Sequence, residues 1–337
     1  MIRFRKNDAG GCTMTKPYVF ITRKLPEDVV APLLAIAEVE MWPHEDMAVP
    51  RDVLVEKAKR ATAILPMVSD PIDEDVLSAG SALRVVANMG VGYDNIDVAA
   101  ATHRGILVCN TPDVLTDTTA DLTFALLLAT ARRLVEAAEF LKEGKWKSWS
   151  PFLLAGADVH HKTIGIVGMG NIGQAVAKRA KGFDMNVLYH NRSRRPEAEE
   201  KLGAVYRPFA DLLAESDFVV CLTPLTSETR HLFNREAFRQ MKKSAIFINA
   251  ARGAVVDEQA LYEALVVGEI AAAGLDVFEH EPVAADHPLV SLPNVVALPH
   301  IGSATYETRR AMMTLARDNI IAVLEGRPPL TPVNRIS

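Results

Sequence analysis

Three groups of residues that could bind anions or transfer protons each follow an apolar, strand-like run. Arg252 follows AIFINAA, the acidic cluster Asp276 to Glu281 follows AAAGL, and His300 follows NVVALP. Histidine can donate a proton near neutral pH, a neighbouring carboxylate favours its protonated form, and arginine can grip a carboxylate bidentately. His300 with Glu281 therefore fits a general acid and its tuning group, and Arg252 fits a substrate clamp. The alternative is that they are structural residues at strand ends.

The elements that must position these residues alternate regularly along the chain. FVVCLTP, AIFINAARG, AAAGLDVF and NVVALPH are separated by helical stretches such as Asp257 to Val267, which Gly268 ends. This alternation predicts a parallel, doubly wound sheet. Because the carboxyl ends of parallel strands meet at one edge, the three groups of candidate residues can belong to a single site.

A glycine-rich turn precedes these strands. Gly168, Gly170 and Gly173 form G-x-G-x-x-G between a predicted strand, Thr163 to Val167, and a predicted helix, Asn171 to Lys181. Such glycines allow a tight turn, close approach of a pyrophosphate, and close helix–strand packing. The first helical residues, including Asn171 and Ile172, would offer N–H groups to an anion. The pattern favours dinucleotide binding over a turn that is glycine-rich for steric reasons alone.

The next predicted strand, Asn186 to Tyr189, ends where a ribose-reading residue is expected. The residues that follow are Asn191, Arg192, Ser193, Arg194 and Arg195. A carboxylate here would accept from the ribose 2′-hydroxyl of NAD, whereas arginines and a hydroxyl would bind a 2′-phosphate. The predicted cofactor is therefore NADPH, with NAD possible at lower preference. The alternative is a solvated basic loop.

An NADPH site implies hydride transfer to a carbonyl carbon, and the alkoxide so formed needs a proton. His300 would supply it, while Arg252 would hold a substrate carboxylate and polarise the carbonyl. The sequence contains no H-E-x-x-H or paired Cys/His spacing for a metal and no G-x-S-x-G nucleophile. Metal chemistry and nucleophilic hydrolysis are therefore not expected.

Composition indicates a globular protein of two domains. The chain has 337 residues, 49% of them hydrophobic, and a net charge of −5, which disfavours nucleic acid or an anionic membrane as partner. Its apolar run from Leu122 to Ala131 is too short for a membrane span, and the N-terminus lacks a secretory apolar region. Cys12, Cys109 and Cys221 lack a motif spacing, so a cytoplasmic location is expected.

Alternating runs from Tyr18 onward predict a second parallel sheet, with a glycine-punctuated loop, NMGVGYDNID, at Asn88 to Asp97. A long helix near Thr118, with Thr118-x-x-Asp121 as its capping box, is apolar nearly all round. It is expected to pack against a second subunit, the alternative being a core helix. A helix from Thr305 to Leu324 returns the tail to the first unit.

The fold class is therefore α/β, with two doubly wound parallel-sheet domains. A Rossmann-like NADP-binding domain, residues 111–300, is expected to be inserted in a flavodoxin-like substrate domain, residues 14–110 plus 301–332. Residues 1–13 are expected to form a disordered extension, and Met14 could be the true start.

Six segments, in order, resemble the D-isomer-specific 2-hydroxyacid dehydrogenases: NMGVGYDNID, TPDVLTDTTADL, GIVGMGNIG, FINAARG, AAAGLDVFEHEP and PHIGSAT. The resemblance spans almost all of Tyr18 to Pro332 and is greatest to glyoxylate/hydroxypyruvate reductases, including bacterial enzymes that also reduce 2-ketogluconate. It implies that the catalytic trio is Arg252, Glu281 and His300.

The same resemblance assigns further residues. Asp276 would hold the nicotinamide carboxamide, Thr223 and Pro224 would line the adenosine half, and the amides of Val91 and Gly92 would receive the substrate carboxylate. Ser303 would assist near the carbonyl. The helix from Thr118 would mediate a homodimer, and Trp149, a better match than Trp146, would reach the partner's site.

These features predict NADPH-dependent reduction of glyoxylate and hydroxypyruvate to glycolate and D-glycerate. 2-Ketogluconate is the alternative substrate. Within the superfamily, the motifs alone do not separate this chain from the D-lactate dehydrogenases. Formate dehydrogenases carry glutamine where Glu281 stands, and phosphoglycerate dehydrogenases often append a regulatory domain for which this chain has no room. In another class, NAD(H)-sensing corepressors share the fold, but the basic loop and lack of long tails disfavour that function.

Overall fold

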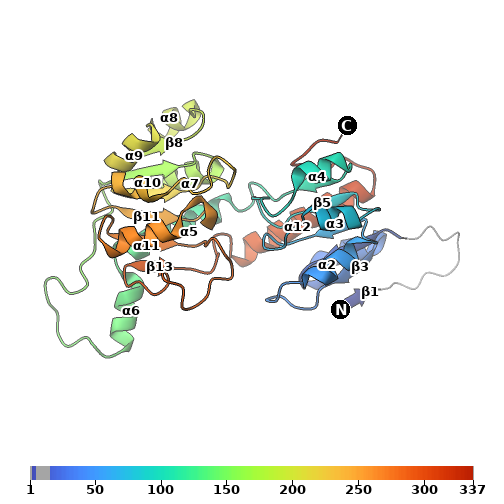
Figure 1. The fold of residues 1–337 in the computed structure, drawn as a ribbon, viewed down its shortest axis with the longest axis horizontal. Helices are drawn as coiled ribbons and strands as arrows, with labels where there is room; N and C mark the ends of the chain where they lie inside the picture. The colour runs from blue at the N-terminus through green and yellow to red at the C-terminus, as the bar shows by residue number, and fades with distance from the viewer. Residues whose placement is uncertain (1, 5–15, 337) are drawn as a thin grey trace. The chain divides into compact units, whose positions relative to one another are not determined.

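The computed structural model describes residues 2–4 and 16–336, and the chain forms two compact units (Figure 1). Unit 1 comprises Met1–Leu115 and Thr305–Ser337, and unit 2 comprises Thr116–Ala304. Unit 2 is therefore inserted within unit 1. The roles of the two units as substrate and cofactor domains stay predictions at this point.

Unit 2 is built on a seven-stranded sheet in which all strands run parallel. The strands in sheet order are β13 (Val295–Ala297), β12 (Ala272–Leu275), β11 (Ile246–Asn249), β10 (Phe218–Cys221), β7 (Thr163–Val167), β8 (Asn186–His190) and β9 (Val205–Tyr206). The order runs outward from β7 and β10 in both directions, which confirms a doubly wound, Rossmann-like sheet.

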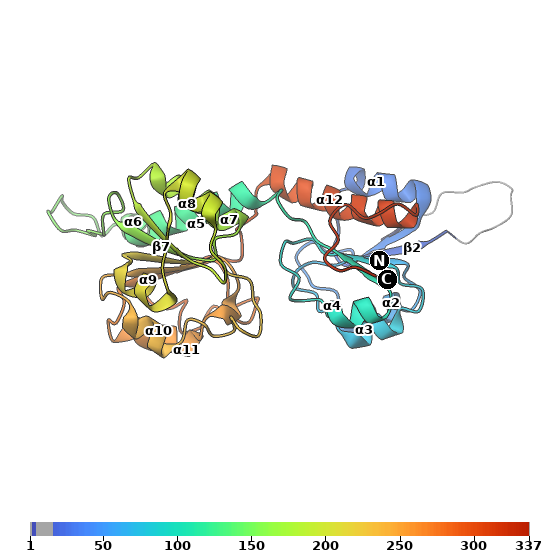
Figure 2. The ribbon, with the colours of Figure 1, turned by 90° about the horizontal axis from the view of Figure 1, so that it is seen from above.

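Helices cover both faces of this sheet (Figure 2). One layer contains α5 (Thr116–Ala131), α6 (Leu134–Lys142), α7 (Asn171–Lys181) and α8 (Pro196–Leu202), and the other contains α9 (Phe209–Glu215), α10 (Arg235–Gln240) and α11 (Glu258–Val266). Along β10, Phe218 and Val220 join the core beneath the first layer, whereas Val219 and Cys221 join the core beneath the second. Burial on both faces explains why these strands are continuous apolar runs.

Unit 1 contains a six-stranded sheet, also covered on both faces (Figure 2). Its strands in sheet order are β1 (Ile2–Phe4), β3 (Glu38–Met41), β2 (Tyr18–Ile21), β4 (Ala63–Leu65), β5 (Val85–Ala87) and β6 (Leu107–Cys109). All pairs are parallel except β1 with β3. The helices are α1 (Glu27–Ile36) and α12 (Tyr306–Leu324) in one layer, and α2 (Arg51–Ala58), α3 (Glu74–Ala79) and α4 (Val98–His103) in the other.

The C-terminal segment completes unit 1. Asn319 of α12 accepts hydrogen bonds from the amides of Leu330 and Thr331, and the Thr331 hydroxyl donates to the carbonyl of Asn110, directly after β6. Helix α12 is thereby linked, through Thr331, to the segment that follows β6 much earlier in the sequence.

Two local expectations are wrong. Helix α5 begins at Thr116, so Thr118 already lies inside it and cannot form the predicted capping box with Asp121. The Asp121 carboxylate accepts instead from Nε of Arg179 in α7, at 2.6 Å. Within the extension expected to be disordered, Ile2–Phe4 form β1, because the free edge of β3 offers backbone partners. Met1 and residues 5–15, including Cys12 and Met14, lie outside the described residues.

Helix α5 is largely a core helix of its own unit. It packs on α7, β11 and β12, and its buried residues include Phe124, Leu126 and Leu127. Packing against a second subunit therefore stays a prediction. None of the helices in the described part of the chain combines the length and apolar character needed to cross a membrane.

Candidate active site

Neighbouring strands of unit 2 bring the three candidate catalytic residues to one sheet edge. Arg252 follows β11, Glu281 follows β12, and His300 follows β13. Since β11, β12 and β13 are adjacent and parallel, these residues leave the sheet at the same carboxyl edge. The glycine turn after β7 lies at that edge too.

His300 and Glu281 form a close pair. Nδ1 of His300 lies 2.7 Å from Oε2 of Glu281, and Oε1 of Glu281 accepts from the amide of Phe278 at 3.0 Å. Burial raises the pKa of the Glu281 carboxyl, but the hydrogen bond and charge of His300, with smaller contributions from Phe278 and Arg252, outweigh it and leave the pKa lowered. Glu281 is thus held as a carboxylate beside Nδ1 of His300, and the other ring nitrogen, Nε2, points away from Glu281.

The loop carrying Arg252 is packed tightly on the loop carrying Glu281. A Cβ at Gly253 would lie 1.8 Å from the carbonyl carbon of Phe278, so only glycine allows the two backbones to approach so closely. The side-chain amide of Asn249, a residue only 1% exposed, donates to the backbone carbonyl of Arg252 at 3.0 Å. Asn249 was not among the predicted site residues, although a buried amide at a strand end was a usable signal.

Asp276 has a structural role that the sequence did not reveal. Its two carboxylate oxygens accept from the amides of Ile301 and Gly302, each at 2.8 Å, and its carbonyl accepts from the amide of His300. His300 has a φ of 54°, in the left-handed region that non-glycine residues rarely adopt. Asp276 therefore fixes the strained turn that presents His300. Burial raises the pKa of Asp276, while the two backbone amides oppose this shift.

Ser303 is half-buried in the turn after Gly302. Nothing in the described part of unit 2 hydrogen-bonds its hydroxyl. Its predicted assistance near a carbonyl stays a prediction.

The glycine turn fits a dinucleotide. A Cβ at Gly168, whose φ is 104°, would lie 2.6 Å from the carbonyl carbon of Leu222, and a Cβ at Gly173 would lie 2.2 Å from the carbonyl oxygen of Gly168. Protein packing therefore requires these two glycines. A Cβ at Gly170 would meet no atom of the described residues within 4 Å, so that glycine leaves open space beside the helix start. This is the position where the pattern places a pyrophosphate.

The start of α7 can accept an anion. The helix begins at Asn171, directly before Ile172 and Gly173, and its N-cap residue, Gly170, has no side chain with which to cap it. The first amides of a helix carry partial positive charge and need acceptors. These residues could hold the pyrophosphate of a dinucleotide. Across the turn, half-buried Thr223 and exposed Pro224 follow β10, and the Thr223 nitrogen would lie 2.7 Å from a Cβ at Gly168.

The basic residues after β8 differ in whether their side chains already bind another residue. Arg194 binds Glu199 through two hydrogen bonds of 3.0 and 2.6 Å, and Asn191 donates to the carbonyl of Ser193. Arg192 is exposed, and no residue of the described chain pairs with its guanidinium. Arg192 is therefore the arginine of this loop most available to an incoming phosphate.

Three predicted site residues do not follow a strand of the unit 2 sheet. Val91 and Gly92 are in unit 1, in the loop after β5, and Val91 O accepts from the side-chain amide of Asn110 at 2.8 Å. Trp149 follows α6 and is 78% exposed. Its predicted contact with a partner subunit stays a prediction.

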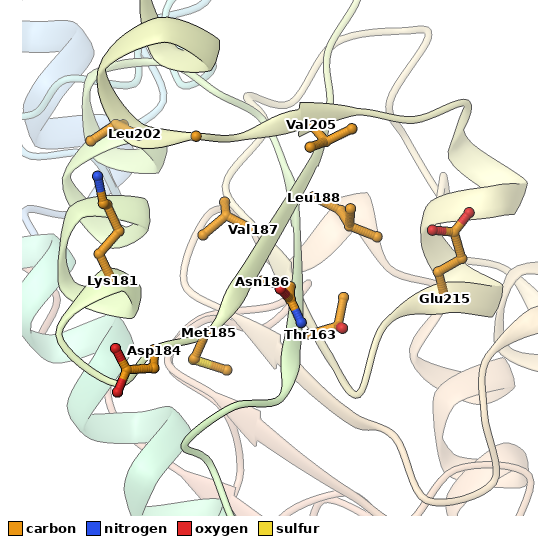
Figure 3. Close-up of a pocket in the computed structure, with 11 residues that line it drawn as sticks. Thr163, Lys181, Asp184, Met185, Asn186, Val187, Leu188, Leu202, Val205 and Glu215 are labelled. Carbon is orange, nitrogen blue, oxygen red and sulfur yellow. The ribbon is translucent and has the colours of Figure 1, made fainter.

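A cavity of about 740 Å³ lies at the opposite edge of the unit 2 sheet (Figure 3). Its lining includes Thr163 and Asn186, the first residues of β7 and β8, together with Lys181 at the end of α7. Because the candidate catalytic residues follow the carboxyl ends of their strands, this cavity is separate from the candidate active site.

The other residues considered for chemistry are less suited to it. Cys109 and Cys221 are buried free thiols, and burial raises the pKa of each to about 12. His280 is exposed, as expected. Within residues 2–4 and 16–336, no group of three or more His, Cys, Asp or Glu side chains is arranged to bind a metal ion.

Comparison with known proteins identifies the family of the chain. The model of the D-isomer specific 2-hydroxyacid dehydrogenase NAD binding domain matches residues 124–302. The chain is 55% identical over 324 residues to a glyoxylate reductase from Thermococcus kodakarensis, covering 95% of this chain and 97% of that protein. It is 53% identical to a glyoxylate reductase from Pyrococcus horikoshii, covering 95% and 96%.

Solved structures give the same assignment. A Thermus thermophilus protein is 47% identical, with a TM-score of 0.87, covering 94% of this chain and 100% of that one. An NADPH-dependent glyoxylate/hydroxypyruvate reductase from Sinorhizobium meliloti, in complex with NADP and malonate, is 36% identical, with a TM-score of 0.83, covering 95% and 97%. The chain therefore belongs to the D-isomer-specific 2-hydroxyacid dehydrogenase family.

Proposed function

We propose that this protein reduces small 2-oxo acids, foremost glyoxylate and hydroxypyruvate, to glycolate and D-glycerate with NADPH. The observation that carries the proposal is the 2.7 Å pair of His300 and Glu281 at the sheet edge that also bears the glycine turn. The names of the archaeal relatives support glyoxylate, and the Sinorhizobium meliloti reductase supports hydroxypyruvate as a second substrate.

In this proposal the nicotinamide cofactor, when bound, supplies a hydride to C2 of the substrate. The C=O π bond opens, and His300 gives its Nε2 proton to the oxygen, because Nδ1 is engaged with Glu281. The Glu281 carboxylate stabilises the imidazolium before the transfer. Arg252 holds the substrate carboxylate and polarises the carbonyl, and Asp276 positions the turn after His300.

The preference for NADPH rests on the loop after β8. Asn191 replaces the acid that would repel a 2′-phosphate, and Arg192 offers an unengaged guanidinium on an exposed loop of the described chain. Arg194 and Ser193 would contribute secondarily, since Arg194 is bound to Glu199. The Sinorhizobium meliloti reductase in complex with NADP supports this assignment by analogy.

A homodimer is part of the proposal. Helix α6 has no buried residue, and apolar side chains remain exposed along α6 and the loop after it. They are Leu134, Val135, Leu141, Trp146, Trp149, Phe152 and Leu153. Such a concentration of exposed apolar surface is typical of a protein interface. In the proposed dimer, Trp149 would reach the partner's active site.

The test is a set of initial rates with glyoxylate, hydroxypyruvate, 2-ketogluconate and pyruvate, each with NADPH and NADH. We expect glyoxylate or hydroxypyruvate with NADPH to give the highest kcat/KM. A lead for 2-ketogluconate would favour the alternative substrate. Nucleotide-dependent binding to a partner protein with no turnover of any 2-oxo acid would overturn the proposal in favour of a corepressor-like function.

A further inference from the structure

We infer that Asn88 and Asn110 are positioning residues that hold the loop 90–93 of unit 1 as an array of amide donors for the substrate carboxylate. The inference rests on the proposed function and extends it, because neither asparagine was assigned a role. Asn88 directly follows β5 and Asn110 directly follows β6, two adjacent parallel strands.

Three consecutive carbonyl groups of the loop accept hydrogen bonds from residues that follow β6 and β5. Gly90 O accepts from the amide of Thr111 at 2.9 Å, and Val91 O accepts from the side chain of Asn110 at 2.8 Å. Gly92 O accepts from the side chain of Asn88, also at 2.8 Å. Two of these three bonds therefore come from asparagine side chains.

Fixing these carbonyls also fixes the next amides. In a planar trans peptide, the C=O of one residue and the N–H of the next point in opposite directions. The bonds to Gly90, Val91 and Gly92 therefore orient the N–H groups of Val91, Gly92 and Tyr93 away from their partners. In the described part of the chain, none of these three N–H groups has an acceptor. Successive free amides of this kind form anion-binding concavities.

The asparagines are themselves held in place. Asn88 is fully buried, and its Oδ1 accepts from Nδ2 of Asn95 at 3.2 Å. Asn95 also donates to the carbonyls of Met67 and Asp70, in the loop after β4. The orientation of Asn88 is thus set by a neighbouring loop rather than by the substrate.

Glycine at position 90 fits this account. A Cβ there would lie 2.2 Å from Cγ1 of Val68, so the loop after β4 packs directly on the start of the array. The array is therefore preorganised by packing and by side-chain hydrogen bonds. A preorganised donor set binds an anion without the cost of ordering a mobile loop.

The inference predicts a specific defect in carboxylate binding. In Asn110→Ala, the peptide between Val91 and Gly92 loses its partner, and Gly92 N–H is no longer held toward the anion. Because hydrogen bonds to charged groups are the stronger ones, we expect KM for glyoxylate and Ki for malonate to rise together by about 10-fold. The Kd for NADPH should match that of the wild type, since the glycine turn lies in unit 2. Asn88→Ala should behave in the same way.

A matched control is Asn334→Ala. Asn334 is a buried asparagine of unit 1 that binds the Val108 amide and the Ile106 carbonyl but not the loop 90–93. We expect it to lower the melting temperature without changing KM or malonate Ki. Where an alanine variant does not fold, Asn110→Ser, which retains a donor too short to reach Val91 O, replaces it.

The outcomes separate this inference from the proposed function. If the wild type reduces glyoxylate and Asn110→Ala keeps the wild-type KM and Ki, the inference is wrong. A parallel change in the Kd for NADPH would also overturn it, because that indicates a general structural defect. If the wild type reduces no 2-oxo acid, the proposed function fails, and calorimetry of malonate binding to wild type and Asn110→Ala then decides whether the array binds carboxylates.

Discussion

Replacing Glu281 by glutamine removes a charge while keeping a side chain of the same shape. The carboxylate lies 2.7 Å from Nδ1 of His300, and the two side chains are 31% and 32% exposed. Two unit charges about 4 Å apart attract by roughly 1 kcal/mol in water and 4 kcal/mol near a protein surface. Partial exposure places this pair between those limits, so we expect the substitution to remove about 2–3 kcal/mol of attraction between the carboxylate and the imidazolium.

For Glu281→Gln, that loss corresponds to a fall in kcat of roughly 30- to 150-fold. The assay is the initial rate of glyoxylate reduction at saturating NADPH and glyoxylate, with NADPH binding followed separately by fluorescence. NADPH binding should stay within about twofold of the wild type, because the glycine turn and the loop after β8 are unchanged.

The loop after β12, which carries Glu281, also provides a matched control. Oε1 of Glu279 lies 3.2 Å from Nε2 of His231, so Glu279 forms a second carboxylate–histidine pair outside the proposed trio. Glu279→Gln should keep near-wild-type kcat. The reasoning would be refuted if Glu281→Gln retained kcat within about threefold of the wild type, or if the two variants lost activity equally.

Three further predictions concern unit 2. Arg192→Ala should raise KM for NADPH by about 10-fold, through loss of a charge-assisted contact, and leave KM for NADH unchanged; an equal effect on both cofactors would exclude phosphate reading. Because the pKa of Glu281 is lowered below its ordinary 4.5, its contribution to stability is present above that value and is lost as pH falls through the folded-state pKa. The melting-temperature difference between wild type and Glu281→Gln should thus shrink as pH falls below 4.5; a difference that grew on acidification would contradict the pairing. Gly253→Ala places a Cβ 1.8 Å from the Phe278 carbonyl carbon, so it should lower both the melting temperature and kcat, and wild-type values for both would show that the loops can separate freely.

Much of unit 2 was predictable because its signals are local. The strand Thr163–Val167 and the helix Asn171–Lys181 were predicted with the bounds that the structure has, since apolar runs and glycines mark their ends. The shared edge of Arg252, Glu281 and His300 followed from a general property of parallel sheets. The hydrogen bond between His300 and Glu281 is present as the residue types suggested.

The features that were missed depend on side-chain contacts that the sequence pattern does not specify. The capping box at Thr118 was predicted wrongly, since α5 begins at Thr116, and Asp121 binds Arg179, 58 positions away. Arg194 is engaged by Glu199 of the following helix, which the basic run did not reveal. The bonds of Asp276 to Ile301 and Gly302 depend on how β12 and β13 align, which no short motif specifies.

The most direct test of the account is His300→Ala, assayed for glyoxylate reduction beside a titration with NADPH. General acid catalysis contributes about 10²- to 10⁴-fold, so we expect kcat to fall within that range while the Kd for NADPH stays at its wild-type value. An unchanged kcat in a variant that binds NADPH normally would contradict the assignment of His300 as the proton donor, and with it the proposed mechanism.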